Sequence, residues 1–166
     1  FIARWFDFRK GSAEKGFDSK GMKKHIVIIG AHRLGKHLVE VLHKSGIEFV
    51  IIDQDPSVTE YYREQGMPAI CGDFNDDHIQ ELAGVSRARL IISTVPSGKE
   101  NMAFVHTMKT NKLRARLIVV AQDEEEALQL YGLGIDYALL PHFIGGQHLA
   151  KIIKSDQKLS GLRELR

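Results

Sequence analysis

The feature that most constrains this chain is a glycine turn that follows an unbroken apolar run. Ile26–Ile29 has the composition of a strand that is buried on both faces, and an amphipathic stretch opens at Arg33. A helix that begins after such a turn has free N–H groups that can hold an anion. In the dinucleotide-binding pattern G-x-G-x-x-G, Gly30 and Gly35 occupy the first and third glycine positions, and His32 occupies the second. The turn predicts a nucleotide site with one departure from the pattern.

An acidic residue at the end of the next strand is the second part of this pattern, because it holds a ribose hydroxyl. The apolar run Phe49–Ile52 is followed directly by Asp53. Asp53 also has a simpler interpretation, since Asp often starts a turn before a proline such as Pro56. The order of strand, turn, helix, strand and acid favours the nucleotide site.

From His25 onward, apolar runs alternate with helical patterns. The runs are Ile26–Ile29, Phe49–Ile52, Ala69–Cys71, Leu90–Ile92, Leu117–Val120 and Tyr137–Leu140. We expect Asn75 to cap the third helix and a last helix, Phe143 to Lys154, to close the domain. The pattern predicts an α/β fold, a Rossmann-like doubly wound parallel six-stranded sheet with strand order 3-2-1-4-5-6.

In such a sheet, a ligand lies outside the carboxyl ends of the strands, at the point where the strand order reverses. This rule places Gly30–Gly35, Asp53, Asp73 and Ser93–Thr94 around one crevice. No catalytic residue is predicted, because no Tyr has a Lys four positions later and neither a P-loop nor a G-x-S-x-G elbow occurs. The histidines lack metal-ligand spacing, so no metal site is predicted. We therefore expect a binding domain, not an enzyme.

Composition and charge narrow the class of protein further. The chain has 166 residues, enough for one domain, and no apolar run approaches the length of a membrane span. Cys71 is a single cysteine, so no internal disulfide forms; we expect it to be a small buried residue in a reducing cytosol. Residues 1–24 carry seven basic and three acidic side chains, whereas residues 25–166 carry 16 basic and 18 acidic ones. A folded part without a basic stripe argues against nucleic acid as a partner.

The first part of the chain differs from the rest. Phe1–Lys24 is punctuated by glycines, as in a linker, and Phe1, Trp5 and Phe8 would share one helix face beside Arg and Lys. Aromatic residues flanked by cations are typical of a cytoplasmic membrane interface, although a segment that docks on its own domain or is disordered stays an alternative. We predict residues 1–22 as a membrane-proximal linker, 23–154 as a nucleotide-binding domain and 155–166 as a C-terminal tail. The initial Phe indicates a piece of a longer protein.

Several stretches together resemble the TrkA-N or RCK (regulator of K⁺ conductance) domains. They are Val27–Gly30 with Arg33–Gly35, Ile51–Asp55, Cys71–Asp76, Ala83–Val85, Glu100–Asn101 and Leu139–Pro141. The resemblance covers roughly Lys23 to Lys154. It implies a domain at the cytoplasmic face of the cell membrane that forms a homodimer and binds NAD, NADH, AMP or ATP. Such a domain regulates an attached potassium channel or cation:proton antiporter, and the N-terminal segment resembles the stretch after the last membrane helix of a Kef-like antiporter.

The resemblance also implies roles for individual residues. The Gly30–Gly35 turn and Arg33 meet phosphate, Asp53 takes the ribose hydroxyls, Asp73 lies near the adenine, and Thr94 and Val95 border the rest of the ligand. The full predicted set is Gly30, Ala31, His32, Arg33, Leu34, Gly35, Asp53, Gln54, Asp55, Gly72, Asp73, Phe74, Thr94 and Val95. The second glycine normally lets the backbone approach a pyrophosphate, so His32 favours a smaller ligand such as AMP or ATP.

Two other functions stay open at this point. The chain could be a cofactor-binding fragment of an NAD-dependent oxidoreductase, or a dimerisation module of the same fold that binds nothing. The last helix carries more apolar side chains than one sheet face should bury: Phe143, Ile144, Leu149, Ile152 and Ile153. We predict a homodimer through this helix, with the Met102–Met108 helix as a second candidate surface.

Overall fold

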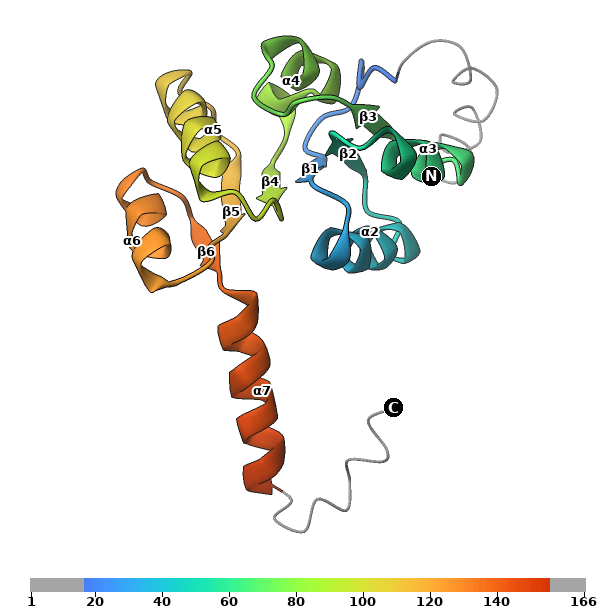
Figure 1. The fold of residues 1–166 in the computed structure, drawn as a ribbon. Coiled ribbons are helices and arrows are strands. Elements are labelled where there is room, and N and C mark those ends of the chain that lie inside the picture. The colour runs from blue at the N-terminus through green and yellow to red at the C-terminus, as the bar shows by residue number, and fades with distance from the viewer. Residues whose placement is uncertain (1–16, 156–166) are drawn as a thin grey trace.

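The computed structural model describes residues 17–155, and its centre is one parallel sheet (Figure 1). Six strands pair in the order β3-β2-β1-β4-β5-β6. Their bounds are β1 (Ile26–Ile29), β2 (Phe49–Asp53), β3 (Ala69–Cys71), β4 (Leu90–Ser93), β5 (Arg116–Val120) and β6 (Tyr137–Leu139). The predicted fold class and strand order are confirmed. The order reverses between β1 and β4, which neighbour each other in the middle of the sheet.

Helices cover both faces of the sheet. They are α2 (Arg33–Lys44), α3 (Pro56–Glu64), α4 (Asp77–Ala83), the short 3-10 helix η2 (Val85–Arg87), α5 (Gly98–Thr110), α6 (Glu124–Gly132) and α7 (Pro141–Ser155). Successive side chains of a strand point to opposite faces. On β1, Ile26 and Ile28 pack with α2 and α3, whereas Val27 and Ile29 pack with α4, α5 and α6. Burial on both faces explains why the central strands read as continuous apolar runs.

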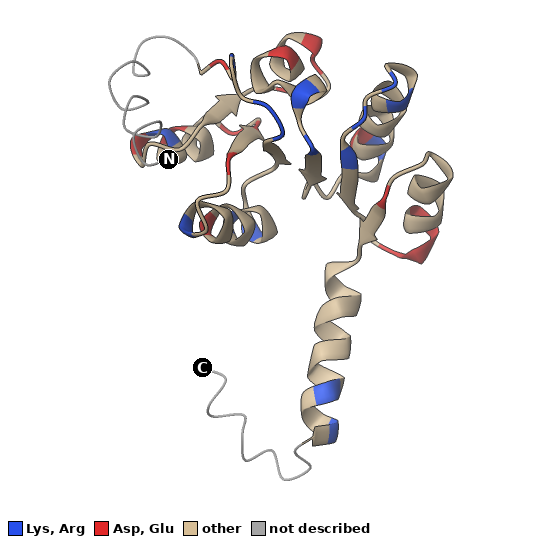
Figure 2. Ribbon diagram, turned by 180° about the vertical axis from the view of Figure 1, so that it is seen from behind, with Lys and Arg blue, Asp and Glu red and all other residues tan. Residues whose placement is uncertain are grey.

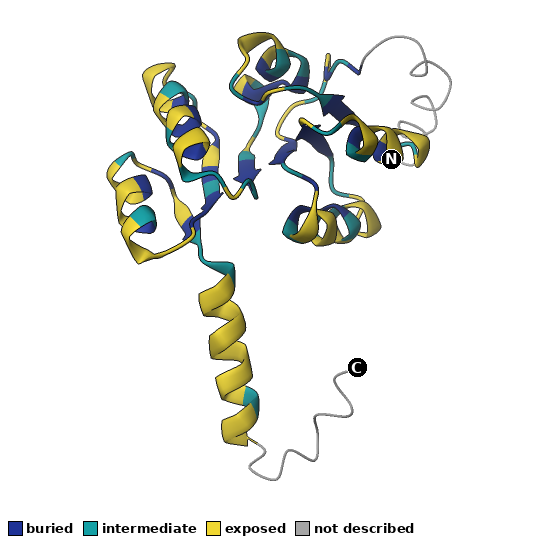
Figure 3. Cartoon of the chain, in the orientation of Figure 1, coloured by how far each residue is buried: buried dark blue, intermediate teal, exposed yellow. Residues whose placement is uncertain are grey.

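Helix α7 does not close the domain, and that expectation is wrong. None of its residues is buried, and it extends away from the sheet beyond β6 (Figures 1 and 3). Four of its large apolar side chains, Phe143, Ile144, Leu149 and Ile153, are between 43% and 54% exposed. An amphipathic pattern predicts that the apolar face of a helix packs against another surface, but it does not predict whether that surface belongs to the same domain.

Three local predictions also need correction. Asp76, not Asn75, caps α4, because its carboxylate accepts hydrogen bonds from the backbone N–H groups of His78 and Ile79. Cys71 is half-buried, not fully buried. On α5, Val105 and Met108 lie in the core, so these side chains are not free to form the second interface that the sequence suggested.

The predicted linker begins to pack on the domain before residue 23. Phe17 is buried in the core, and the backbone N–H of Ser19 donates to the Leu82 carbonyl at 2.8 Å. The guanidinium of Arg87 also donates to the Ser19 hydroxyl at 3.0 Å. The proposed aromatic face of Phe1, Trp5 and Phe8 and nearly all of the predicted tail lie outside the described residues. Within residues 17–155, no helix is both long and apolar enough to cross a membrane.

Candidate functional site

The glycine turn sits at the carboxyl end of β1 and is shaped by two close approaches. Gly30 has a left-handed backbone (φ +80°), and a Cβ there would lie 2.9 Å from the Thr94 hydroxyl oxygen. Gly35 is buried in the first turn of α2, and a Cβ there would collide with the Gly30 carbonyl oxygen. Side chains are therefore excluded at both positions, for different reasons.

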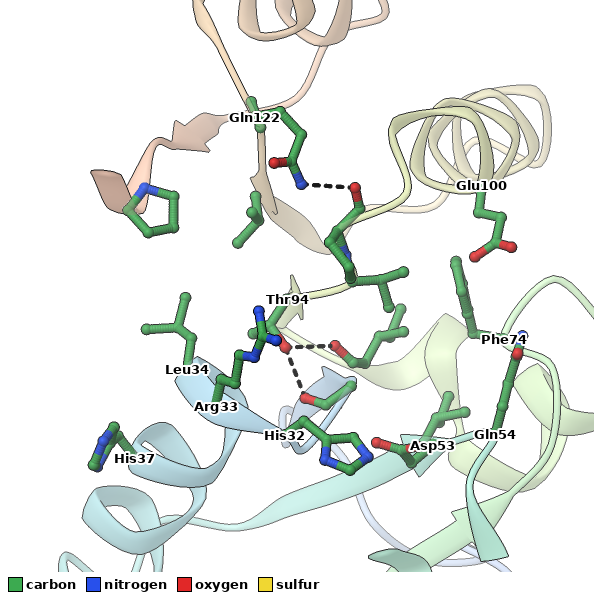
Figure 4. A pocket seen from close by; sticks show the side chains of 18 of the residues that line it. His32, Arg33, Leu34, His37, Asp53, Gln54, Phe74, Thr94, Glu100 and Gln122 are labelled. Atoms are coloured by element: carbon green, nitrogen blue, oxygen red, sulfur yellow. Dashed lines mark hydrogen bonds between the residues drawn. The ribbon is translucent and has the colours of Figure 1, made fainter. Parts of the chain in front are cut away.

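Hydrogen bonds from three other segments hold this turn. One carboxylate oxygen of Asp53 accepts from the Ala31 N–H at 2.7 Å, and the other accepts from the Asp55 N–H at 2.9 Å. The Thr94 hydroxyl donates to the Gly30 carbonyl at 2.9 Å (Figure 4). The buried Tyr62 hydroxyl donates to the Ala31 carbonyl at 3.1 Å, and burial raises the pKa of Tyr62 to about 12. The turn is thus fixed before any ligand arrives.

The N-terminus of α2 is left without a side-chain cap. His32 is its N-cap residue and accepts no hydrogen bond through its side chain. The other α-helices for which an N-cap is defined differ, since Asp55, Asp76, Ser97 and Asp123 cap α3, α4, α5 and α6 with side-chain oxygens. Unsatisfied N–H groups and the positive end of the helix dipole favour an anion at this position.

Asp53 retains acceptor capacity beside this helix end. An ionised carboxylate has about four lone-pair positions, and the two backbone contacts use one on each oxygen. Its side chain lines the same cavity as Gly30 and His32. Asp53 can therefore clamp the turn and accept hydroxyl donors from a ligand at the same time.

A cavity of about 850 Å³ lies at the carboxyl ends of β1, β2, β4 and β5. Its first part, which we call the turn half, is formed by Gly30, His32, Arg33, Asp53, Gln54, Gly72 and Phe74. Its second part, which we call the α7 half, is formed by Pro96, Val120, Ala121, Gln122, Pro141 and His142. The cavity is within the size range of small-molecule sites and reaches from the glycine turn to the base of α7.

Ten of the fourteen predicted site residues line this cavity: Gly30, His32, Arg33, Leu34, Asp53, Gln54, Gly72, Phe74, Thr94 and Val95. Ala31 and Gly35 are buried behind the turn, and Asp55 caps α3. Asp73 is exposed and accepts a hydrogen bond from the Asn75 N–H at 2.8 Å. It is not among the lining residues, and its place near an adenine stays a prediction, as do the roles of the others.

His32 adopts an extended backbone (φ −84°, ψ 166°), so the backbone at the second glycine position does not require glycine. Its imidazole Nε2 lies 3.6 Å from an Asp55 carboxylate oxygen, and its side chain is 63% exposed. Hydrogen bonds from Ser57 are the main cause that lowers the pKa of Asp55, and His32 contributes less. The obstruction at this position is therefore an exposed side chain that lines the cavity, not a change in the backbone of His32.

The α7 half was not predicted from the sequence. Gln122 donates from its side chain to the Pro96 carbonyl at 2.8 Å, which joins the loops after β4 and β5 (Figure 4). Glu100 and His37 also line the cavity, from α5 and α2. Ser93, predicted at the crevice, instead donates to the buried Asn101 side chain at 2.7 Å. Glu100 and Pro141 belong to stretches quoted for the family resemblance, but no site role was predicted for them. Gln122 belongs to no motif, and only its position after β5 could have suggested it.

Comparison with known protein families identifies the family to which the chain belongs. The model of the TrkA-N domain matches residues 26–141, which span the sheet and the cavity. The chain belongs to the TrkA-N domain family.

Relatives of this TrkA-N domain are proteins of potassium transport. It is 36% identical over 137 residues to Potassium channel protein 1 of Methanocaldococcus jannaschii, covering 80% of this chain and 40% of the relative. It is 28% identical over 110 residues to the glutathione-regulated potassium-efflux system protein KefC of Cronobacter sakazakii, covering 66% of this chain and 18% of the relative. The chain thus spans less than half the length of these relatives.

Solved structures share the fold. The TrkA-N domain of the inner membrane protein ybaL from Escherichia coli has a TM-score of 0.76 at 22% identity, over 80% of this chain and 98% of that one. The Kef CTD of Shewanella denitrificans in AMP-bound form has a TM-score of 0.70 at 20% identity, over 82% and 81%. The GsuK channel bound to NAD has a TM-score of 0.69 at 21% identity, over 85% and 25%.

Proposed function

We propose that this TrkA-N domain is a regulatory module that binds an adenine nucleotide, NAD(H) or AMP/ATP, in the cavity at the carboxyl ends of the strands. The observation that supports the proposal most strongly is that the N-terminus of α2 and the carboxylate of Asp53 lie at the same end of the cavity. The uncapped N-terminus of α2 can receive a phosphate, and Asp53 has free lone pairs for ribose hydroxyls. Solved relatives in AMP-bound and NAD-bound forms support the same ligand class.

The two halves of the cavity suit different parts of such a ligand. In the turn half, Arg33 and the N–H groups of α2 would face a phosphate, and Asp53 would face the ribose beside it. A mononucleotide would fill this half. A dinucleotide would extend past Thr94 into the α7 half and reach His142.

Isothermal titration of the whole chain with AMP, ATP, NAD and NADH tests the proposal. We expect a saturable heat with a micromolar dissociation constant for at least one of them, and an affinity that is weaker by roughly 1–3 kcal/mol in Asp53→Ala. No heat with any of the four at millimolar concentration, from a folded protein, would leave only the dimerisation module.

We also propose that the domain binds its ligand without catalysing a reaction on it. Among the described residues that line the cavity there is neither a tyrosine nor a lysine, the pair that single-domain oxidoreductases use. The expected outcome is no change in NADH absorbance when the chain is incubated with NADH and candidate carbonyl substrates. Turnover of NADH would favour the oxidoreductase fragment.

The transport protein that the domain regulates is a separate proposal. We propose a Kef-like monovalent cation:proton antiporter, with the domain at the cytoplasmic face of the cell membrane; a potassium channel is the alternative that the 36% identical relative favours. Regulation would follow from differential affinity, because a nucleotide that prefers one arrangement shifts its population. Potassium and proton fluxes, measured together on the complete protein in liposomes, distinguish the two, since only an antiporter moves protons in exchange for potassium.

The exposed face of α7 supports a homodimer. Leu149 and Ile153 are about half exposed and lie four positions apart on the helix. Apolar patches of this kind mark contact surfaces. We expect a light-scattering mass of two 18.7 kDa chains for the wild type and of one chain for Leu149→Asp/Ile153→Asp. Leu128→Asp on α6, where Leu128 is 71% exposed, is the matched control and should stay dimeric. A wild-type mass of one chain at high concentration would contradict the dimer.

A further inference from the structure

The edge of the sheet opposite the cavity, where the strands begin, carries a row of basic residues. Strands β1, β4 and β5 start side by side: the Arg89 N–H donates to the His25 carbonyl at 3.0 Å, and the Arg116 N–H donates to the Arg89 carbonyl at 3.1 Å. Figure 2 shows Lys and Arg on the segments that lead into these strands. We call the exposed members the amino-edge row: Lys23, Lys24, Arg89, Lys112, Arg114 and Arg116.

No member of this row forms an ion pair within residues 17–155. The ion pairs in that part of the chain join Lys20 to Asp18 and His32 to Asp55, and neither involves the row. Two acids precede neighbouring strands at this edge, Glu48 before β2 and Asp136 before β6, against the six basic residues of the row; Asp136 also accepts a hydrogen bond from the Leu117 N–H at 2.7 Å. Four of the six, Arg89, Lys112, Arg114 and Arg116, belong to residues 25–166, whose 16 basic and 18 acidic side chains nearly balance. The expectation that the folded part lacks a basic stripe is therefore wrong at this edge.

The N-terminal part of the chain joins the domain at the same edge. The Lys24 N–H donates to the Arg87 carbonyl at 2.9 Å, and Arg87 donates from its side chain to the Met22 carbonyl at 3.3 Å. Residues 1–16 lie outside the described residues, but their sequence combines Trp5 and phenylalanines with Arg and Lys. Such a composition is typical of the interface between a membrane and water. This aromatic and cationic segment is therefore attached, through residue 17, to a part of the chain that packs at the edge carrying the row.

We propose that the amino-edge row docks on the surface of an anionic phospholipid bilayer. Lys and Arg near such a surface are attracted by the negative headgroups, and the attraction adds up over several residues. The row extends across three adjacent strands, so its members share one edge of the sheet. The cavity and the base of α7 lie at the opposite edge and stay open to ligand in the docked domain (Figure 1). This surface is independent of whether the cavity binds a nucleotide.

Co-sedimentation of the whole chain with vesicles tests the proposal. The probes are vesicles of phosphatidylcholine alone and vesicles in which part of it is replaced by phosphatidylglycerol, at low ionic strength. We expect binding to the anionic vesicles only. Arg89→Gln/Arg116→Gln should lower the partition coefficient about 25-fold, because each cation contributes roughly fivefold. The matched control Lys36→Gln/Lys99→Gln removes two exposed cations from the first turns of α2 and α5, towards the other edge, and should change it less than twofold.

A second variant separates charge from folding. Lys24 and Lys112 have left-handed backbones (φ 59° and 53°), a conformation that glycine adopts more easily than lysine. Lys24→Gly/Lys112→Gly therefore removes two charges of the row and relaxes the backbone at both positions. Urea denaturation checks that the variant is folded, and weaker vesicle binding by the folded variant then reports the loss of charge. Vesicle binding equal to wild type in both row variants would overturn the proposal and assign binding to residues 1–16. Equal binding of the wild type to neutral and anionic vesicles would overturn it too.

Discussion

The two edges of the sheet present different chemical groups to a ligand: positioned backbone groups at the carboxyl edge and exposed basic side chains at the amino edge. At the carboxyl edge, backbone groups are held in place by buried or half-buried side chains of distant segments, such as Asp53, Tyr62 and Thr94. At the amino edge, the chemistry lies in exposed basic side chains that make no ion pair within the described residues. A site made of positioned backbone should fail sharply when one group is displaced. A row of exposed charges should weaken in small steps.

The largest expected effect is at the carboxyl edge. Gly35→Ala places a methyl group against the Gly30 carbonyl oxygen, which is backbone and cannot move aside. We expect the free energy of unfolding to fall by about 3 kcal/mol, as for overpacking at a rigid position. Urea denaturation measures the change.

The control for this prediction is Gly132→Ala, where no atom lies within 4 Å of the new Cβ. Its effect on the free energy of unfolding should stay within about 1 kcal/mol. Equal denaturation midpoints for Gly35→Ala and the wild type would show that the turn is not rigid.

The second prediction concerns Asp53. Asp53→Ala leaves the Ala31 and Asp55 N–H groups without their acceptor and removes the lone pairs that face the cavity. We expect nucleotide affinity to fall by roughly 1–3 kcal/mol, and the wild type to bind NAD more tightly than NADP because a carboxylate repels a 2′-phosphate. Calorimetric titration measures both.

Arg89→Gln at the amino edge serves as the control for Asp53→Ala and should leave nucleotide affinity unchanged. Equal wild-type affinities for NAD and NADP would remove Asp53 from the ribose. A matching loss of affinity in Arg89→Gln would show that the two edges are coupled.

The third prediction concerns a buried group at the amino edge. His25 is fully buried, its Nε2–H donates to the Ala83 carbonyl at 2.9 Å, and its Nδ1 has no partner among the described residues. Burial is the main cause that lowers the pKa of His25; Arg87 lowers it further, while the Ala83 carbonyl and Glu48 act in the opposite direction.

The unfolded chain takes up a proton on this imidazole near pH 6.5, whereas the folded chain does so only at lower pH. The free energy of unfolding should therefore fall as the pH drops below about 6.5, by at most ~1.4 kcal/mol per pH unit for this group, and level off below the folded pKa. Urea denaturation across this range should show a shallower pH dependence in His25→Gln. The same slope in both proteins would exclude His25 as the cause.

The smallest effect is expected at His32. Its exposed imidazole lines the cavity, while its backbone is already extended. His32→Gly should therefore open the approach to a pyrophosphate and tighten NAD binding about fivefold, with less change for AMP. Titration with both ligands tests this, and no gain for NAD would show that the side chain does not obstruct the site.

The sequence predicts the parts of the structure that rest on local patterns. Continuous apolar runs gave the strands and their order, and the spacing of Gly30, Gly35 and Asp53 located the turn half of the cavity. The α7 half could not be predicted, because Gln122 and His142 belong to no motif and meet only in the folded sheet. The position of α7 was not predicted, because an amphipathic sequence pattern does not indicate which surface its apolar face packs against. The amino-edge row was missed because net charge averages over all faces.

The central claim is that a nucleotide binds at the carboxyl edge and nowhere else in the domain. Backbone amide NMR of the whole chain during titration with AMP tests it most directly, because every edge is observed at once. We expect chemical shift changes at Gly30, Leu34 and Gly72, none at Arg89 and Arg116, and saturation of these changes at a roughly 5- to 160-fold higher AMP concentration in Asp53→Ala, which corresponds to a loss of about 1–3 kcal/mol. Shifts confined to the amino edge, or no shifts at millimolar AMP, would contradict the account.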